Sequence, residues 1–179
     1  MALMIAPTRS CSVAALVLLA ACGTSTGGTE PPTPQAPADA ANILTVSTRK
    51  ATYPWNEVSF AGDGIVATIA NLSTRDYFSR IGDFFGGSGD QDPVYIAGGT
   101  DAAVERLAAD GSWTVLPTGI LIEGSKVVGL RSGKTYELRG HLEEPRVVGT
   151  MRLRLRYFTT PNTAGVTPLV DYSPPFVVR

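Results

Sequence analysis

The chain has 179 residues, of which 17% are charged and 44% hydrophobic, and its formal charge is -1 at pH 7. This composition is typical of one globular domain with room for an appendage, and it excludes a chain that is disordered throughout. It also argues against a nucleic-acid binder, because binding to phosphate usually needs a strongly basic domain.

Residues 1–21 form the first predicted segment, which has the pattern of an export signal. Arg9 is its one charged side chain, and the apolar run CSVAALVLLAA covers residues 11–21. That run is shorter than the about 20 residues with which a helix crosses a bilayer. We therefore expect a cleaved signal peptide and not a permanent membrane helix.

The signal peptide ends in Leu19-Ala20-Ala21-Cys22. This sequence resembles the lipobox of bacterial lipoproteins, in which a large apolar residue and two small ones precede a cysteine. The resemblance implies that a signal peptidase recognises Leu19, Ala20 and Ala21 and cuts before Cys22, which carries diacylglycerol and often a further acyl chain such as palmitate. Two or more acyl chains anchor a protein stably to a membrane. The alternative is an ordinary secretory peptide in which Cys22 has no role.

Residues 22–41 form the second predicted segment, a tether that follows the lipidated cysteine. Its sequence GTSTGGTEPPTPQAPADAA offers no large apolar side chain to bury, so it should stay solvated and reach about 25 Å as a coil or about 60 Å when extended. Gly23 stands where lipoproteins kept in the inner membrane often have Asp, which favours the outer membrane in a Gram-negative cell. The G-x-S-x-G pattern at 23–27 lacks the flanking strand and helix of a nucleophile elbow.

Residues 42–179 form the third predicted segment, in which apolar residues recur with a period of two. This period predicts strands. The predicted strands cover residues 43–50, 64–71, 102–116, 118–130, 135–142, 149–158 and 176–179. The third range contains Asp110-Gly111, a dipeptide typical of a tight hairpin turn.

The clearest strand is 149–158, GTMRLRLRYF, in which apolar residues alternate with Arg152, Arg154 and Arg156. Such alternation predicts an antiparallel strand with one buried face and one wet face. We interpret the three arginines as part of a solvated sheet surface, and the alternative is a ligand-binding stripe.

Many short strands in a segment without cysteine predict an all-β fold, with a β-sandwich as first choice and a barrel as second. The pieces LTVSTRKATY, GIVATIANLS, VERLAADGSW, SGKTYELRGHL and GTMRLRLRYF resemble bacterial immunoglobulin-like domains of envelope proteins. The resemblance implies an immunoglobulin-like antiparallel β-sandwich without catalytic residues. It also implies that Trp113 and Tyr136 are core or sheet aromatics and that Gly149 begins its strand. Met151 stands where the family usually has Tyr.

The most unusual stretch is 81–101, which joins two phenylalanines to a glycine-rich acidic loop. Its candidate binding residues are Asp83, Phe84, Phe85, Asp90 and Asp92, and Asp101 ends the stretch. Function concentrates on loops that a rigid scaffold holds, so this loop is the candidate site for a partner. The alternatives are simple packing of the phenylalanines, or a calcium site that lacks the glycine and distal glutamate of an EF-hand.

Catalytic and metal sites find little support in the sequence. His141 is the one histidine, which excludes multi-histidine zinc sites, and no sequence context supports a Ser-His-Asp triad around it. Residues 129–135 resemble a phosphate-binding loop, but Val128 replaces its first glycine and a strand follows. We expect no enzyme activity, no metal and no cofactor.

The sequence therefore predicts a lipid-anchored protein of the cell envelope whose domain acts in binding or structural support. Its expected partners are the membrane, through the anchor, and an envelope protein or glycan. The alternative is a protease inhibitor that acts through the exposed loop at 83–93, since one bacterial inhibitor family has a comparable small sandwich.

Overall fold

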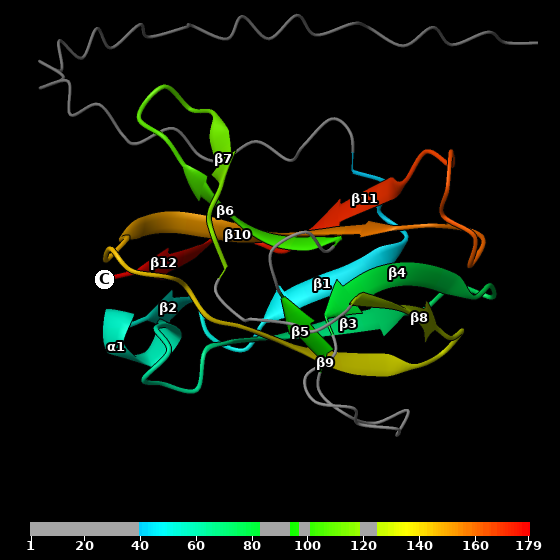
Figure 1. Ribbon diagram of the computed structural model, residues 1–179, viewed down its shortest axis with the longest axis horizontal. Coiled ribbons are helices and arrows are strands. Elements are labelled where there is room, and N and C mark those ends of the chain that lie inside the picture. Colours follow the sequence, from blue (N-terminus) through cyan, green and yellow to red (C-terminus); the bar gives the residue numbers. More distant parts are fainter. Residues whose placement is uncertain (1–39, 83–93, 97–100, 119–124) are drawn as a thin grey trace, which may run out of the picture. The chain divides into compact units, whose positions relative to one another are not determined.

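The computed structural model describes residues 40–82, 94–96, 101–118 and 125–179. By its contacts the chain divides into two units, Met1–Pro31 and Pro32–Arg179, and every described residue belongs to the second. The strands of that unit form two sheets that pack face to face (Figure 1). The predicted all-β sandwich is confirmed.

The first sheet has the strand order β1-β3-β9-β5-β4-β8 and is the lower layer in Figure 1. Its strands are β1 (Leu44–Thr48), β3 (Ile65–Asn71), β9 (Thr135–Gly140), β5 (Val94–Ile96), β4 (Tyr77–Gly82) and β8 (Ser125–Leu130). β5 runs parallel to β9, and the other neighbours in this sheet are antiparallel.

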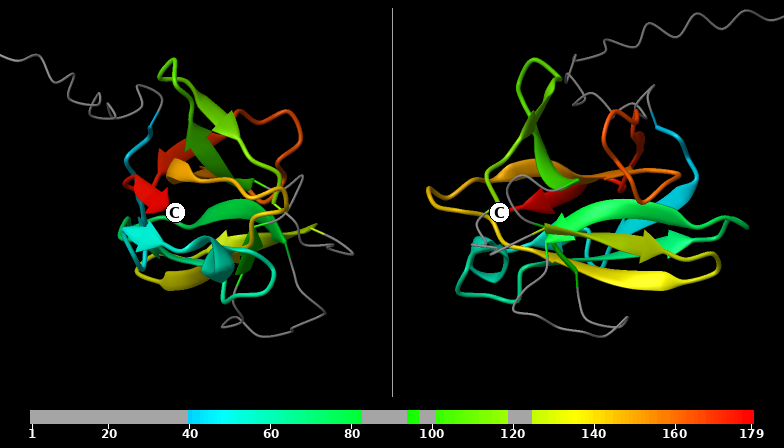
Figure 2. Two further views of the ribbon diagram at one scale, coloured as in Figure 1. Left: turned by 90° about the vertical axis from the view of Figure 1, so that its left-hand side faces the viewer. Right: turned by 45° about the vertical axis from the view of Figure 1, so that its right-hand side comes forward.

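The second sheet has the order β2-β12-β10-β6-β7, and a further strand, β11, also pairs with β10. Its strands are β2 (Thr52–Tyr53), β12 (Phe176–Val178), β10 (Gly149–Tyr157), β6 (Ala102–Leu107), β7 (Trp113–Val115) and β11 (Leu169–Tyr172). β2 is parallel to β12, and a single helical turn, α1 (Trp55–Val58), follows β2. The β6–β7 hairpin rises from this sheet on the side away from the first one (Figures 1 and 2).

The core lies between the two sheets and depends on the alternation along β10. Met151, Leu153, Leu155 and Tyr157 are each at most 1% exposed. They pack with side chains from the first sheet, among them Ile65, Ile69, Ile81, Leu130 and Leu138. Burying one such side chain stabilises the fold by about 1.5–3 kcal/mol.

Most predicted strands are present. The ranges 43–50, 64–71, 135–142, 149–158 and 176–179 contain β1, β3, β9, β10 and β12. The predicted hairpin joins β6 to β7, and Gly111 in its turn has a φ of +83°, which suits glycine. Asp110 accepts hydrogen bonds from the hydroxyl and the amide of Ser112 at 2.6 and 2.9 Å, and these bonds lower the pKa of Asp110. Gly149 begins β10, as predicted, with a φ of +127°.

The carboxylate of Asp171 in β11 joins the two sheets. It is 2% exposed and accepts hydrogen bonds from the backbone N–H groups of Asn42, Ile43 and Leu44, at 2.5, 3.1 and 2.7 Å. These groups lead into β1 of the first sheet, and Asn42 has a φ of +55° that turns the chain there. The Tyr157 hydroxyl donates a fourth bond at 2.7 Å. Burial, and then this bond to the carboxylate, raise the pKa of Tyr157 well above its usual value.

Tyr157→Phe should change how the stability depends on pH. A tyrosine in the unfolded chain has a pKa near 10. The raised pKa of Tyr157 in the folded state therefore contributes fully to the free energy of unfolding below pH 10. Above pH 10 this stability falls by about 1.4 kcal/mol per pH unit in the wild type, because the folded state keeps the proton. The variant should lose about 2 kcal/mol at pH 8, where the bond to Asp171 is missing, and show a shallower decline between pH 10 and 11.5. Urea unfolding of both proteins at pH 8, 10 and 11.5 measures the free energy of unfolding. An equal decline of this free energy between pH 10 and 11.5 in the two proteins would contradict the prediction.

Candidate functional site

The residues of the predicted anchor and of the predicted binding loop lie outside the described residues. They are Leu19, Ala20, Ala21 and Cys22 for the anchor, and Asp83, Phe84, Phe85, Asp90 and Asp92 for the loop. Both therefore stay predictions, and so does the inhibitor hypothesis that uses the loop. In the described ranges, no helix is long and apolar enough to cross a membrane.

The sequence suggests one continuous loop over residues 81–101, but strands lie at its start and within it. β4 extends through Gly82, and β5 lies within the first sheet, where Val94 is in register with Leu138 of β9. Asp101 directly precedes β6 of the second sheet and is 4% exposed. Its carboxylate accepts a hydrogen bond from the backbone N–H of Arg80 at 2.8 Å. Asp101 is therefore held inside the fold and is no part of an exposed acidic loop.

Arg152, Arg154 and Arg156 lie on the outer face of the second sheet, as the alternation along β10 predicts. They are less solvated than we expected. The Arg152 side chain is 9% exposed, and those of Arg154 and Arg156 are 27% and 41% exposed. The interpretation as a solvated surface is therefore wrong for Arg152, which other side chains of the same face cover.

Glu105 of β6 holds two of these arginines. It is directly opposite Arg152 in the register of β6 and β10 and is 4% exposed. Its Oε2 accepts a bond from Nε of Arg152 at 2.8 Å and lies 2.8 Å from Nη2, and its Oε1 accepts a bond from Nη1 of Arg154 at 2.9 Å. One buried carboxylate therefore fixes two guanidinium groups.

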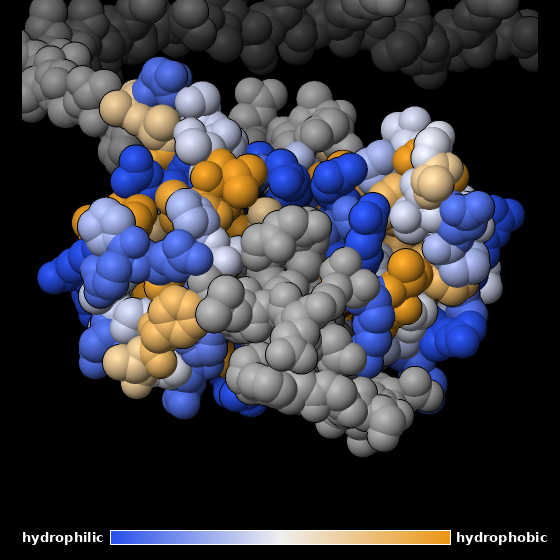
Figure 3. Space-filling model, viewed as in Figure 1, coloured by the Kyte–Doolittle hydropathy of each residue, from blue (hydrophilic) through white to orange (hydrophobic). Residues whose placement is uncertain are grey.

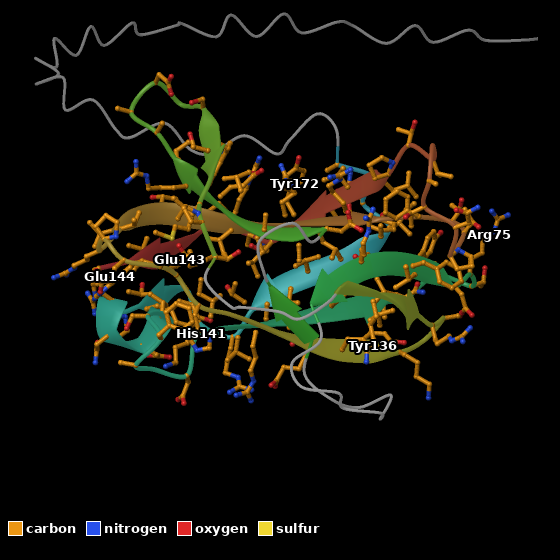
Figure 4. The ribbon with its side chains drawn as sticks, in the orientation of Figure 1. Arg75, Tyr136, His141, Glu143, Glu144 and Tyr172 are labelled. Carbon is orange, nitrogen blue, oxygen red and sulfur yellow. The ribbon has the colours of Figure 1, made fainter. Side chains whose placement is uncertain are left out.

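Two aromatic rings enclose the Arg152 guanidinium. Its central carbon lies 4.2 Å from the ring centroid of Trp113 in β7 and 4.0 Å from that of Tyr172 in β11. In Figure 4, Tyr172 lies above β10, on the side away from the first sheet. Each contact of this kind is worth about 0.5–2 kcal/mol, depending on desolvation. We name the outer side of the second sheet that carries Glu105, Trp113, Arg152, Arg154, Arg156 and Tyr172 the arginine face.

The arginine face is an expensive way to stabilise a sheet. The lost hydration of a buried ion pair offsets much of its electrostatic attraction, and apolar residues of similar volume often stabilise a fold as well or better. What the arrangement achieves is geometry, since Glu105 and the two rings hold the Arg152 guanidinium in one position. The result is a rigid polar and aromatic surface on the central strand of the sheet.

His141 follows the end of β9, partly buried, as predicted. Its ring is parallel to that of Phe60, with centroids 5.7 Å apart, and Nε2 is 3.1 Å from the carbonyl oxygen of Gly62. Its Nδ1 has no hydrogen-bond partner among the described residues, so these residues form no triad around it. Within the same residues, no three His, Cys, Asp or Glu side chains gather to hold a metal. In Figure 4, His141 lies in the left half of the view and Arg75 at its right-hand end.

The stretch 129–135 runs from the end of β8 through a polar turn into β9, and a turn before a strand is what we predicted there. The backbone N–H of Ser132 and Nη1 of Arg131 donate to the Asp76 carboxylate at 2.9 and 2.7 Å, and β9 begins at Thr135. These bonds, the one from Arg131 above all, lower the pKa of Asp76. A carboxylate thus occupies the amide that a phosphate-binding loop would offer to its ligand, which disfavours nucleotide binding there.

The stack of Trp113, Arg152 and Tyr172 was not predicted from the sequence, although part of its signal is present. The hairpin turn sets Leu107 opposite Trp113 and Glu105 opposite Val115, which places Trp113 on the same face as Glu105. The strand that carries Tyr172 is short, and its sequence LVDY does not predict which strand it joins.

Comparisons of the chain with known protein families, with curated proteins and with solved structures find no match. The arginine face is therefore interpreted from its own geometry.

Arg152→Met should destabilise the protein by about 2–4 kcal/mol, because it leaves the buried Glu105 carboxylate with Arg154 alone. The double variant Glu105→Leu with Arg152→Met removes both charges and should be more stable than the single variant. Urea unfolding of both measures the difference. Arg49→Met is the control, since Arg49 pairs with Glu137 at an exposed position and should cost less than about 1 kcal/mol. The single variant Glu105→Leu completes the comparison. If the double variant loses as much free energy of unfolding as the two single variants together, the coupling between Glu105 and Arg152 is contradicted.

Proposed function

We propose that this protein is a bacterial cell-envelope lipoprotein, anchored to a membrane through Cys22, whose β-sandwich binds a partner and catalyses no reaction. The observation that carries the proposal is the arginine face, a rigid surface of aromatic and charged side chains on the central strand β10. Aromatic residues and arginine are the residue types most enriched where proteins bind tightly.

The anchor is supported by the order of the predicted segments. An export signal, a lipobox that ends at Cys22 and a polar tether follow one another, and the first strand of the sandwich begins at Leu44. The tether is long enough to hold a domain near a membrane without fixing its orientation. We propose the outer membrane in a cell that has one.

An immunoglobulin-like type of sandwich is supported by Tyr136. This residue is near the start of β9, and its hydroxyl oxygen accepts a hydrogen bond from the backbone N–H of Arg131, five residues upstream, at 2.7 Å. Immunoglobulin domains contain a similar corner, in which a tyrosine near the start of a strand bonds to the backbone a few residues upstream. The corner differs from theirs in one respect. The immunoglobulin strands that flank it belong to different sheets, whereas β8 and β9 belong to the same sheet.

The chemistry of the arginine face supports binding more than catalysis. Arginine stays protonated in proteins, so Arg152, Arg154 and Arg156 are poor candidates for general acids or bases. Their planar guanidinium groups offer several N–H donors in a fixed arrangement, which suits recognition of a partner. Their rigid positions on a sheet would reduce the entropy lost when the partner binds.

The anchor is tested by comparing Cys22→Ala with Cys11→Ala, because Cys11 lies in the signal that processing removes. Mass spectrometry of the wild type and of Cys11→Ala should show a lipid-modified chain that begins at residue 22, in the membrane fraction. Cys22→Ala should carry no lipid and should leave the membrane fraction, because it lacks the acyl chains that anchor the wild type. A wild-type chain without lipid mass would overturn the anchor.

The binding surface is tested with Trp113→Ala, which removes one side of the Arg152 stack. Immobilised protein is used to capture envelope proteins and cell-wall glycans from the same organism, and each captured species is quantified. The variant should retain about tenfold less of the specific partner, as for a binding hot spot. Phe60→Ala, at an aromatic side chain that is 59% exposed and packs on His141, is the control and should retain it. Equal capture by all three proteins would contradict the assignment of this face.

A further inference from the structure

We propose that the arginine face binds an acidic polysaccharide, that is, a glycan polymer with a carboxylate or phosphate group at regular intervals. This inference rests on the proposed function, which makes the face a binding surface, and it adds the chemical class of the ligand.

The first argument is that positive and negative side chains lie at different depths below the surface here. The two carboxylates, Glu105 and Asp101, have side chains that are only 5% exposed. The arginines around them reach solvent, since the side chains of Arg154 and Arg156 are 27% and 41% exposed. The side chain of Arg80, which comes from β4 of the first sheet and lies beside Asp101, is 45% exposed. A ligand that approaches the face therefore meets guanidinium groups first, with the compensating negative charge beneath them.

The second argument is the balance of charge. Asp101 lies 3.9 Å from Nε of Arg80 and 4.0 Å from Nη1 of Arg156, distances too long for good hydrogen bonds. With Glu105 shared between Arg152 and Arg154, two carboxylates serve four arginines among the described residues, three on the arginine face and Arg80 beside it. The cluster keeps a net positive charge and N–H donors that an acidic ligand could use.

Other arginines of the protein show how unusual this arrangement is. Arg49 pairs with Glu137 and Arg131 pairs with Asp76, and in both pairs the arginine is about 60% and the carboxylate about 36% exposed. Both charges of such a pair face the solvent side by side, so the surface there presents neither sign alone. The cationic character of the arginine face thus comes from its buried carboxylates and not from the number of arginines.

The third argument is the regular spacing along β10. Arg152, Arg154 and Arg156 are alternate residues of one strand, so their Cα atoms follow each other at about 6.5–7 Å. Arg154 and Arg156 reach solvent at this step, and the covered Arg152 ends the row. Such a row suits a polymer whose acid groups also repeat at a regular step. A polypeptide offers this step only where acidic residues occupy alternate positions of an extended segment, whereas an acidic polysaccharide carries an acid group in every repeat, which favours the polysaccharide.

The fourth argument is the presence of aromatic side chains in the same row. Trp113 and Tyr172 flank Arg152 and are both partly exposed, and Val115 beside Trp113 in β7 is 47% exposed. Pyranose rings have apolar C–H faces that pack on such side chains. Figure 3 shows the side of the sandwich, where hydrophobic and hydrophilic residues adjoin one another in the upper part of the view.

The test measures binding of the purified lipoprotein, in a neutral detergent, by affinity electrophoresis through gels that contain a polymer. Polygalacturonate supplies carboxylates, a glycerol-phosphate teichoic acid supplies phosphates, and fully methyl-esterified polygalacturonate is the uncharged control. We expect saturable binding to at least one acidic polymer, weakening as salt is added, and at least about tenfold weaker binding to the ester. The acidic polymer that binds identifies the acid group.

The decisive variant is Arg154→Gln with Arg156→Gln, which should weaken binding about tenfold. The matched control is Arg49→Gln with Arg131→Gln, which removes the same charge elsewhere and should change the affinity less than about twofold. Arg156→Gln alone, which leaves both arginines on Glu105, should weaken binding about threefold and guards against a folding defect in the double variant.

The proposal is overturned if neither acidic polymer binds, if the methyl ester binds equally well, or if the control variant loses as much affinity as Arg154→Gln with Arg156→Gln. It is also overturned if the lipoprotein's arginine face binds only vesicles of phosphatidylglycerol, since its ligand would then be a lipid surface. If the polymers fail while Trp113→Ala still loses a captured protein, the polysaccharide inference is wrong and the proposed binding function stands. If the polymers fail and Trp113→Ala captures every species as well as the wild type, the polysaccharide inference and the proposed binding function of this face are both wrong.

Discussion

The sandwich depends on one buried carboxylate, that of Asp171. Residues 40–179 contain no cysteine, so no disulfide joins the two sheets, and apolar packing does not fix the direction from which the chain enters. Asp171 supplies this constraint, because it accepts bonds from the N–H groups of Asn42, Ile43 and Leu44 at the start of the first sheet and from Tyr157 in the second. A buried carboxylate without these donors would be very unfavourable, so the first residues of the domain must take this path.

The same strand that anchors this constraint also creates the arginine face. Tyr157 reaches Asp171 from the inner side of β10, while Arg152, Arg154 and Arg156 project from its outer side. Because β10 pairs with β6, β11 and β12, its backbone has little freedom, and side chains on both sides inherit that rigidity. The core and the proposed binding surface are therefore two sides of one alternating pattern, and a change of register by one residue would destroy both.

The sequence predicted what depends on local pattern and missed what depends on pairing between distant segments. The alternation in 149–158 and the Asp110-Gly111 turn predicted β10 and the β6–β7 hairpin, because period and turn chemistry are local signals. β5 was missed, since its three residues follow a glycine- and aspartate-rich stretch and form a strand only between β9 and β4. The burial of Arg152 was missed for the same reason. Alternation assigns a residue to a face, but it does not tell whether Trp113 and Tyr172 will cover it.

The placement of charge explains how a nearly neutral protein could present a cationic surface. The formal charge of the chain is -1, and its total charge gives no reason to expect an acidic ligand. What a ligand meets, however, is the charge that reaches solvent, and burying Glu105 and Asp101 beneath the arginines separates the two signs by depth. The fold bears the desolvation of these carboxylates, and hydrogen bonds from the arginines and the backbone offset it. In this arrangement the groups that hold the outer face together are the same groups that give it its sign, so stability and the proposed recognition depend on the same carboxylates.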